Sequence, residues 1–276
     1  MGDLFQQILS NDVPENYVEE CIVYLKTDEA VVIKTLSEFL NNNLGITGTF
    51  NFTKKGIFLK GIDSDEKEMI DVALHEKNFD KYHCDRPYSR GVPLDTFHSM
   101  FKNLKKKDRV ILYITKADPT KIRTRIYNDD KDRDSRSFTP TCDPIPVDCA
   151  RIKGYKKPIS IPGTEFQRMC KDIQSYKTID VICYPGGLIF QTRQGQMAGT
   201  DKTFTYGDKK PTKEDDENNL IYVYTFDCKL ICQMAKLYGF SKRIHIYTLK
   251  DVPMKINATI GTLGEMNIIL KDERNA

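Results

Sequence analysis

Apolar residues recur every three or four positions in four segments, a spacing that predicts amphipathic helices. We expect the helices at residues 28–42, with Asp28 as the cap, and at 94–104, 164–175 and 226–238. Their apolar faces comprise Val32, Leu36, Phe39 and Leu40; Leu94, Phe97, Phe101 and Leu104; Phe166, Met169, Cys170 and Ile173; and Phe226, Leu230, Met234 and Leu237.

Short runs of β-branched and aromatic residues between these helices, bounded by turn residues, predict strands. We expect the clearest strands at 21–26, 47–53, 56–61, 69–74, 80–84, 110–115, 122–127, 135–139, 159–161, 179–184, 188–192, 202–206, 220–225, 244–249, 254–260 and 266–270. Each half then runs strand, helix, strands, helix, strands. Two helices packed on mostly antiparallel sheets in each half define an α+β fold class.

One stretch of the chain occurs twice. RVILYITKADPTKIRTRI at 109–126 matches RIHIYTLKDVPMKINATI at 243–260 without a gap, 134 positions later, with seven identities. A repeat of this length indicates duplication, so two similar domains are predicted, each able to bury its own core. We place an N-terminal extension at 1–20, the domains at 21–141 and 156–276, and an extended connector with two prolines at 142–155.

Composition excludes little. The 276 residues carry 42 basic and 39 acidic side chains, a net charge of +3, so charge alone does not imply nucleic acid. None of the eight cysteines forms a C-x2-C pair, and Cys228 with Cys232 would supply only two zinc ligands. We therefore expect no metal and no cofactor. No apolar run reaches the ~18 residues of a membrane span, and reduced, intracellular thiols are the default expectation.

The polar faces of three predicted helices lean basic, and in the first helix Glu38 offsets Lys34, four residues earlier. Acidic residues gather instead in the loops at 129–134 and 214–217. Two interpretations are open: the charges simply solvate helix exteriors and complement helix dipoles, or they form a face that binds nucleic-acid phosphates without reading bases. The candidate DNA-binding residues are Lys34, Lys102, Lys105, Lys106, Arg168, Lys171, Lys229 and Lys236.

Four segments resemble sliding clamps of the proliferating cell nuclear antigen family. They are FDKYHCDRPYSRG at 79–91, PGTEFQRMCKDI at 162–173, KDVP at 250–253 and GTLGEMNIIL at 261–270. The resemblance runs from about residue 21 to the C-terminus. It implies a DNA-clamp fold and a non-enzymatic homotrimeric ring, opened by a clamp loader, that encircles duplex DNA and tethers a polymerase and other replication proteins.

The same resemblance assigns surfaces. It implies that six of the eight basic residues face the DNA channel, all except Lys105 and Lys106, which follow the second predicted helix. It also implies that partner peptides bind near Ile62, Pro253 and Ile269 and along the connector, which contains Ile145 and Ile152. It places subunit contacts on the strand near 135–139 and on roughly 195–205. The family's closing motif is absent, since Lys271-Asp272-Glu273 follow Leu270, and Glu66 and Ile269 replace a histidine and an aromatic residue beside the pocket.

Two other functions remain as alternatives. A checkpoint-type clamp subunit would act in a heteromeric ring as a damage-signalling scaffold. A metal-dependent nuclease would use the carboxylates of Asp129, Asp130, Asp132 and Asp134, although this run is interleaved with basic residues in a polar loop. For the clamp, the resemblance implies a nuclear location, or a cytoplasmic viral replication site if a virus encodes it, with no membrane partner.

Overall fold

The computed structural model describes residues 15–128, 133–147, 152–155, 157–192, 201–218 and 220–273. The first half contains η1 (a 3₁₀ helix, Glu15–Glu20), β1 (Cys21–Thr27), α2 (Ala30–Asn43), β2 (Thr47–Thr53), β3 (Gly56–Ile62), β4 (Glu68–His75), η2 (Glu76–Asn78), β5 (Lys81–Cys84), β6 (Tyr88–Pro93), α3 (Leu94–Phe101), β7 (Arg109–Thr115), β8 (Lys121–Asn128) and β9 (Arg133–Pro140).

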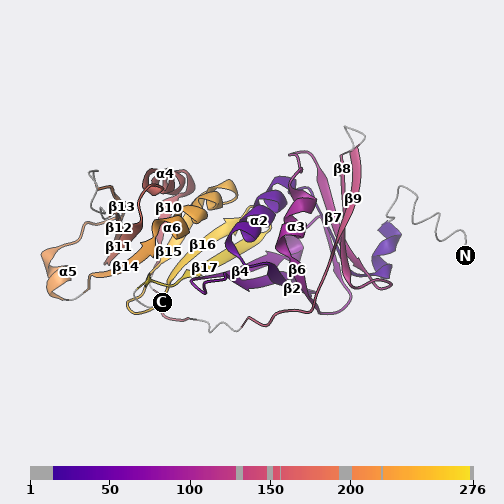
Figure 1. The fold of residues 1–276 in the computed structure, drawn as a ribbon, viewed down its shortest axis with the longest axis horizontal. Coiled ribbons are helices and arrows are strands. Elements are labelled where there is room, and N and C mark those ends of the chain that lie inside the picture. The colour runs from indigo at the N-terminus through magenta and orange to yellow at the C-terminus, as the bar shows by residue number, and fades with distance from the viewer. Residues whose placement is uncertain are drawn as a thin grey trace, which may run out of the picture.

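The second half contains β10 (Ile159–Pro162), α4 (Gly163–Ile173), β11 (Thr178–Tyr184), β12 (Gly187–Thr192), β13 (Thr203–Gly207), α5 (Lys213–Glu217), β14 (Tyr222–Asp227), α6 (Cys228–Gln233), η3 (Met234–Gly239), β15 (Arg243–Tyr247), β16 (Met254–Ile260) and β17 (Gly264–Leu270). The described parts of the connector between the halves are extended, and they run along the side of the molecule opposite the long helices (Figure 1). The α+β class with antiparallel sheets is confirmed.

Three antiparallel sheets organise the strands. Their orders are β5-β1-β7-β8-β9, β10-β15-β16-β17-β4-β3-β2-β6, and β13-β12-β11-β14. The eight-stranded sheet crosses from one half to the other because β17 pairs with β4 along seven residues, from Gly264 opposite Leu74 to Leu270 opposite Glu68. Among the described strands, β9 and β13 are sheet edges that lie toward opposite ends of the molecule (Figure 1).

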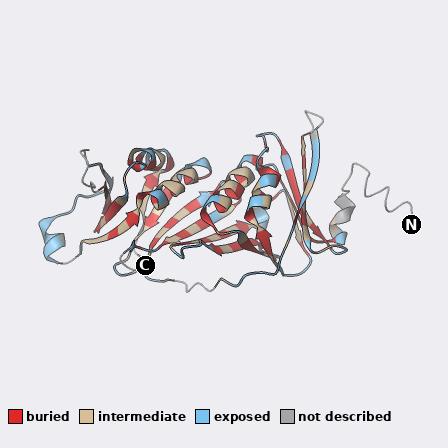
Figure 2. Cartoon of the chain, viewed as in Figure 1, coloured by how far each residue is buried: buried red, intermediate tan, exposed pale blue. Residues whose placement is uncertain are grey.

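The predicted apolar helix faces form the core. Every predicted apolar-face residue is buried except Leu230, which is partly buried and packs against the same cluster. Figure 2 shows the buried residues concentrated in the strands and in parts of the helices that lie over them. The burial follows from the 3.6-residue period of the helices meeting the two-residue period of the strands.

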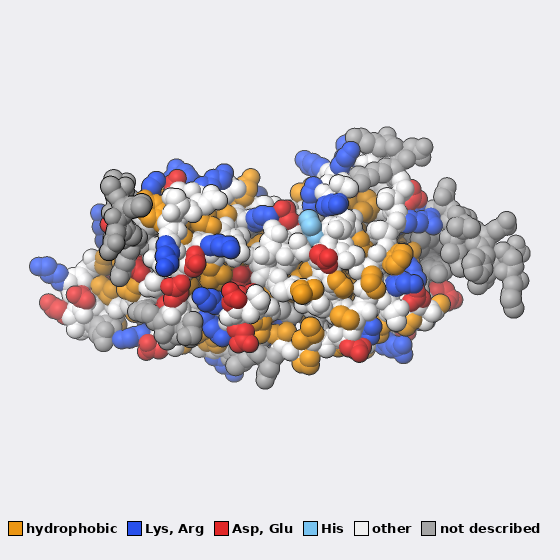
Figure 3. Space-filling view, in the orientation of Figure 1, with side chains coloured by type: hydrophobic (Ala, Val, Ile, Leu, Met, Phe, Trp, Pro, Cys, Tyr) orange, Lys and Arg blue, Asp and Glu red, His pale blue; other side chains and the backbone are white. Residues whose placement is uncertain are grey.

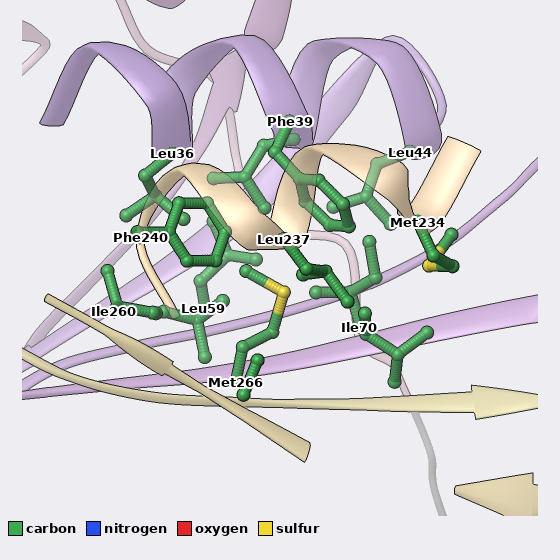
Figure 4. Packing of buried hydrophobic residues seen from close by; sticks show 14 of the residues in the cluster. Leu36, Phe39, Leu44, Leu59, Ile70, Met234, Leu237, Phe240, Ile260 and Met266 are labelled. Atoms are coloured by element: carbon green, nitrogen blue, oxygen red, sulfur yellow. The ribbon is translucent and has the colours of Figure 1, made fainter. Parts of the chain in front are cut away.

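The sequence predicts a separate core in each half. In the structure the core is instead continuous through the junction of the two halves. Phe39 of α2 meets Phe240, just after η3, in an edge-to-face contact with centroids 6.1 Å apart (Figure 4). Gly261 has φ +53°, and a Cβ there would lie 2.7 Å from Val32 Cγ2. A glycine is therefore required where this turn of the second domain approaches α2.

Several predicted boundaries are wrong for local reasons. The first helix begins at Ala30, and Asp28 does not cap it, because no side chain caps that end. The helix expected at 226–238 is split into α6 and η3, and Phe226 belongs to β14. Strand β6 was not predicted. Neither was α5, whose exposed capping box joins Thr212 and Asp215 inside the expected charged loop.

The duplicated stretch forms a hairpin in both halves, but the two hairpins differ in register. Tyr113 lies opposite Arg123, whereas Tyr247 lies opposite Lys255, the counterpart of Lys121. A shift of two residues keeps every side chain on its face of the sheet, which is why the apolar pattern is unaffected. The gapless sequence match could not reveal this difference.

Candidate nucleic-acid interface and partner pocket

The four long helical segments lie on one side of the eight-stranded sheet (Figure 1). Helix α2 packs against α3, α4 packs against α6 and η3, and α2 also contacts η3 of the other half. The result is one helical surface that runs across both halves. Lysine and arginine side chains gather along its outer margin in Figure 3.

The predicted DNA-binding residues all lie on or beside this surface. Arg168 and Lys171 on α4 and Lys229 on α6 are exposed, and Lys34 on α2 is half-exposed. Acidic Asp95 and Glu165 occupy the first turns of α3 and α4, where a negative charge complements the helix dipole. On α4 the exposed Arg168 and Lys171 occupy the later turns.

One of the predicted lysines, Lys102, is not inside a helix as expected, whereas Lys105 and Lys106 follow the end of the helix as expected. Helix α3 ends at Phe101, so Lys102 caps it, and Lys105 and Lys106 lie in the turn that follows. The backbone N–H of Lys105 donates to Asp108 Oδ2 at 2.8 Å, which closes that turn and holds its exposed lysines at the end of the helical surface. The Asp108 side chain therefore fixes the charged turn, and the pattern of apolar residues along the helix does not indicate this contact.

Lys236 has a partner inside the chain. Its ammonium group donates to Glu38 Oε1 at 2.5 Å, which joins η3 of the second half to α2 of the first. This hydrogen bond is the main reason why the pKa of Glu38 is lowered. Along α2 itself, Glu38 follows Lys34 by four residues, and this helical spacing gives no indication of the tertiary partner Lys236. Lys236 therefore helps to join the halves as well as lying on the basic surface.

A second feature is a hollow of ≈ 570 Å³ under the connector, on the sheet face away from the helices. Of the five predicted partner-binding residues, Ile152 and Ile269 line it. Pro253 is linked to it, since Tyr155, which lines the hollow, donates its hydroxyl to the Pro253 carbonyl at 2.8 Å. We call this hollow the connector pocket.

Ile62 and Ile145 lie outside the lining of the connector pocket. Ile62 ends β3 and is 36% exposed, and Ile145 in the connector is 53% exposed. Ile145 is held by two hydrogen bonds with the Thr49 hydroxyl, one from its backbone N–H and one to its carbonyl. The early connector is thus fastened to β2, and Ile145 extends the apolar surface rather than the hollow.

Two lining residues of the connector pocket were missed by sequence analysis. The Lys255 ammonium lies 3.9 Å from the ring centroid of Tyr247 and 5.0 Å from that of Tyr155. Burial lowers the pKa of Lys255, and burial raises the pKa of Tyr155 to about 12, so its hydroxyl stays protonated at neutral pH. Lys255 lies in the duplicated stretch, but only the fold brings it to the connector.

The three charged residues after β17 do not form a loose tail at the connector pocket. The buried Asp272 accepts a hydrogen bond from the Thr225 N–H at 2.9 Å, which ties the end of the chain to β14. Lys271 donates its N–H to the Lys67 carbonyl. Lys271 and Glu273 line a different hollow, at the junction of the two halves.

The described residues contain no cluster of side chains suited to hold a metal ion, since no three His, Cys, Asp or Glu side chains among them are placed to hold one. Of the four loop aspartates, Asp134 is engaged by the Arg125 guanidinium at 2.9 Å, and the other three lie outside the described residues. None of the described helices is long and apolar enough to cross a membrane.

Comparison with known proteins places these features in a family. Residues 22–143 match the N-terminal domain model of proliferating cell nuclear antigen, and residues 152–273 match its C-terminal domain model. The chain belongs to the proliferating cell nuclear antigen family, and the resemblance and DNA-clamp fold inferred from the sequence are confirmed. A sliding-clamp role follows from that membership.

Several relatives cover nearly the whole chain. "Probable DNA polymerase sliding clamp 1" of Paramecium bursaria Chlorella virus 1 is 21% identical over 91% of this chain and 97% of its own length. "Probable DNA polymerase sliding clamp" of Autographa californica nuclear polyhedrosis virus is 22% identical over 87% and 91%. "Proliferating cell nuclear antigen 2" of Drosophila melanogaster is 20% identical over 91% and 97%.

Proposed function

We propose that the protein is a DNA sliding clamp that encircles duplex DNA as a homotrimer and tethers a polymerase. The observation that carries the proposal is the agreement between family membership and the two sheet edges, β9 and β13, toward opposite ends of the described chain. A chain with such an edge strand at each end can join head to tail, and a closed ring covers both of these edges.

The junction inside the chain supplies a template for such a contact. Strand β17, which follows β16, pairs antiparallel with β4, which follows β3. Strand β9 of the first half corresponds to β17 of the second, and β13 of the second half corresponds to β4 of the first. Strand β9 follows β8, β13 follows β12, and each lies at the edge of its sheet. Pairing β9 of one subunit with β13 of the next would repeat the internal junction and continue the helical surface around the ring.

The two proposed contact strands differ in how fully the structure describes them. Strand β9 contains the whole of the first expected contact at 135–139. Strand β13 contains the last part of the second expected contact at 195–205, and residues 195–200 lie outside the described residues. The subunit contact is therefore argued from β9 and β13 themselves.

The mechanism is topological and electrostatic rather than catalytic. A ring whose inner wall carries Arg168, Lys171, Lys229 and the other basic residues would contact phosphates without reading bases, so it could slide. The connector pocket on the outer side would hold partner peptides. Polymerases and a clamp loader are the proposed partners. We place the protein in the nucleus or at a viral replication site.

Encirclement makes the first testable prediction. After a clamp loader has placed the protein on a nicked circular duplex, the protein should co-elute with the circle and should leave when a restriction enzyme linearises the DNA. Gel filtration with a labelled clamp measures the retained fraction. Retention that is equal on circles and on open-ended DNA would contradict encirclement.

The basic surface makes the second prediction. Arg168→Ala with Lys171→Ala should weaken association with end-blocked duplex equally for all sequences. It should also make the plot of log affinity against log salt shallower by ~0.9 for each phosphate that the protein no longer neutralises. The matched control is Lys60→Ala with Lys153→Ala, because these lysines line the connector pocket on the other side of the sheet. An unchanged slope in the α4 variant would show that this surface does not meet phosphates.

A checkpoint-type clamp subunit is the less favoured alternative. Both halves match the proliferating cell nuclear antigen models, which supports a replicative clamp. Purification only in company with two different clamp-like chains would reverse this choice.

A further inference from the structure

A hollow of ≈ 320 Å³ lies where the two halves meet, apart from the connector pocket. Its walls come from the end of α2, the turn between β3 and β4, the start of α6 and the residues after β17. We call it the junction hollow. One of its lining residues, Lys229, also belongs to the basic surface, and the proposed ring does not use the hollow as a contact.

Two buried acceptors in the lining of the junction hollow have no hydrogen-bond partner among the residues that the structure describes. Glu68 is 2% exposed and Asn43 is 5% exposed, yet Glu68 Oε1 and Asn43 Oδ1 are both unpaired. The amide orientation of Asn43 is fixed, because its Nδ2 donates to the Phe39 carbonyl at 2.7 Å. Both unpaired atoms are therefore acceptors, and a buried unpaired acceptor is costly unless a ligand satisfies it.

The charges around the junction hollow favour a positively charged donor. Besides Glu68, four carboxylates line it: Asp63, Asp65, Asp227 and Glu273. Three lysines oppose them: Lys67, Lys229 and Lys271. Among the described side chains, no three potential metal ligands converge on one point. An organic cation with several N–H donors fits this arrangement better than a metal ion, because it needs spaced acceptors and not a coordination sphere.

Binding of a cation in the junction hollow should change the protonation state of Glu68, and this change can be measured. Burial, with the neighbouring Asp63 carboxylate as a second cause, raises the pKa of Glu68 to about 8. The site on its own therefore holds mostly the neutral acid at neutral pH. A bound cation would stabilise the carboxylate form and expel its proton.

We propose that the junction hollow binds one cationic nitrogen group, a guanidinium or a primary ammonium, which donates hydrogen bonds to Asn43 Oδ1 and to the Glu68 carboxylate. The group would come from a basic side chain of a protein partner or from a free polyamine. The proposal goes beyond the clamp function and does not depend on ring formation or on DNA.

The test is calorimetric titration of the full chain, without DNA, with N-acetyl-arginine amide and separately with spermidine. Each titration is run in two buffers that differ in ionisation enthalpy. We expect saturable binding, with a buffer-dependent heat that reports release of a proton. Preference for the arginine amide would identify a protein side chain as the source, and preference for spermidine would identify a polyamine.

Variants and pH make the result specific. Glu68→Gln should lose the proton release and at least tenfold in affinity. Glu66→Gln is the matched control: Glu66 makes the same charge change two residues away, is exposed and does not line the hollow, so binding should be unchanged. With the unmodified chain, affinity should increase about tenfold for each unit by which the pH rises toward the pKa of Glu68. Above that pKa the affinity should become constant.

Three results would overturn the proposal. They are the absence of saturable binding by either probe, equal binding to the Glu68→Gln and unmodified chains, and an affinity that does not change with pH. The last measurement needs no variant, so a folding defect in Glu68→Gln would not obscure the answer. None of these results bears on encirclement, which is tested with circular DNA.

Discussion

Replacing Phe138 with arginine is expected to break the proposed ring into single chains. Phe138 is an apolar side chain on the edge strand β9, it is 58% exposed, and the Lys121 ammonium lies 5.3 Å from the centroid of its ring. A neighbouring subunit that pairs with β9 would cover it. An arginine there would put a second positive charge beside Lys121 and remove the apolar surface that the neighbour covers.

Truncating a central apolar side chain of an interface costs about 2 kcal/mol or more, which is ~30-fold in the affinity of each interface. Sedimentation at the concentration where the unmodified protein is a ring should therefore show mainly single chains of 31.8 kDa. The control is Ile46→Arg, since Ile46 is 87% exposed and lies outside both edge strands. A Phe138→Arg protein that sediments like the unmodified protein would show that β9 is not a subunit contact.

The second large effect is expected from Glu68→Gln, which should stabilise the fold increasingly as the pH rises. The pKa of Glu68 is raised from 4.5 to about 8, so the folded state prefers the neutral acid. Below pH 4.5 both the folded and the unfolded state are protonated and the preference is fully satisfied. Between 4.5 and about 8 the folded state alone keeps the proton, so stability falls by ~1.4 kcal/mol per pH unit.

Glutamine cannot ionise, so the variant escapes this fall in stability. Its advantage should grow through that pH window, reach a few kcal/mol and become constant above about pH 8. Urea unfolding at a series of pH values measures the difference, and Glu66→Gln should follow the unmodified protein because Glu66 is exposed. A difference between Glu68→Gln and the unmodified chain that is the same at every pH would show that Glu68 does not titrate in this window.

Local patterns predicted the helices and most strands well. The apolar faces of all four helices pack into the core because a 3.6-residue period directly encodes which side meets a sheet. Boundaries failed where a neighbouring group decided them. The Asp108 carboxylate closes the turn after α3, and α6 changes to a 3₁₀ helix at Met234. The turn after α3 depends on a hydrogen bond from Lys105 to Asp108, which the period of the apolar residues does not reveal.

Pairings between distant segments could not be predicted. Nothing in the sequence sets β17 beside β4 or Glu38 beside Lys236, since each pairing joins residues from different halves. The basic surface was predicted as a set of residues, and the fold places that set on one side of the sheet. The connector pocket was predicted only in part: Ile152 and Ile269 line it, but Tyr155 and Lys255 required the folded connector.

Asp272, near the end of the chain, has a structural role that the sequence did not indicate. Asp272 stands where the family resemblance leads one to expect part of a peptide-gripping motif. In the fold it is buried and accepts the Thr225 N–H. Lys271 and Glu273 beside it line the junction hollow, so the partner recognition that we propose at the connector pocket would rely on Ile269, Tyr155 and Lys255.

The central claim is that the edge strands β9 and β13 close the chain into a ring of three. Light scattering on the purified protein, without DNA or partners, tests it most directly. We expect a solution mass three times the 31.8 kDa of one chain at micromolar concentration. A mass equal to one chain, together with no stimulation of any polymerase, would contradict the claim.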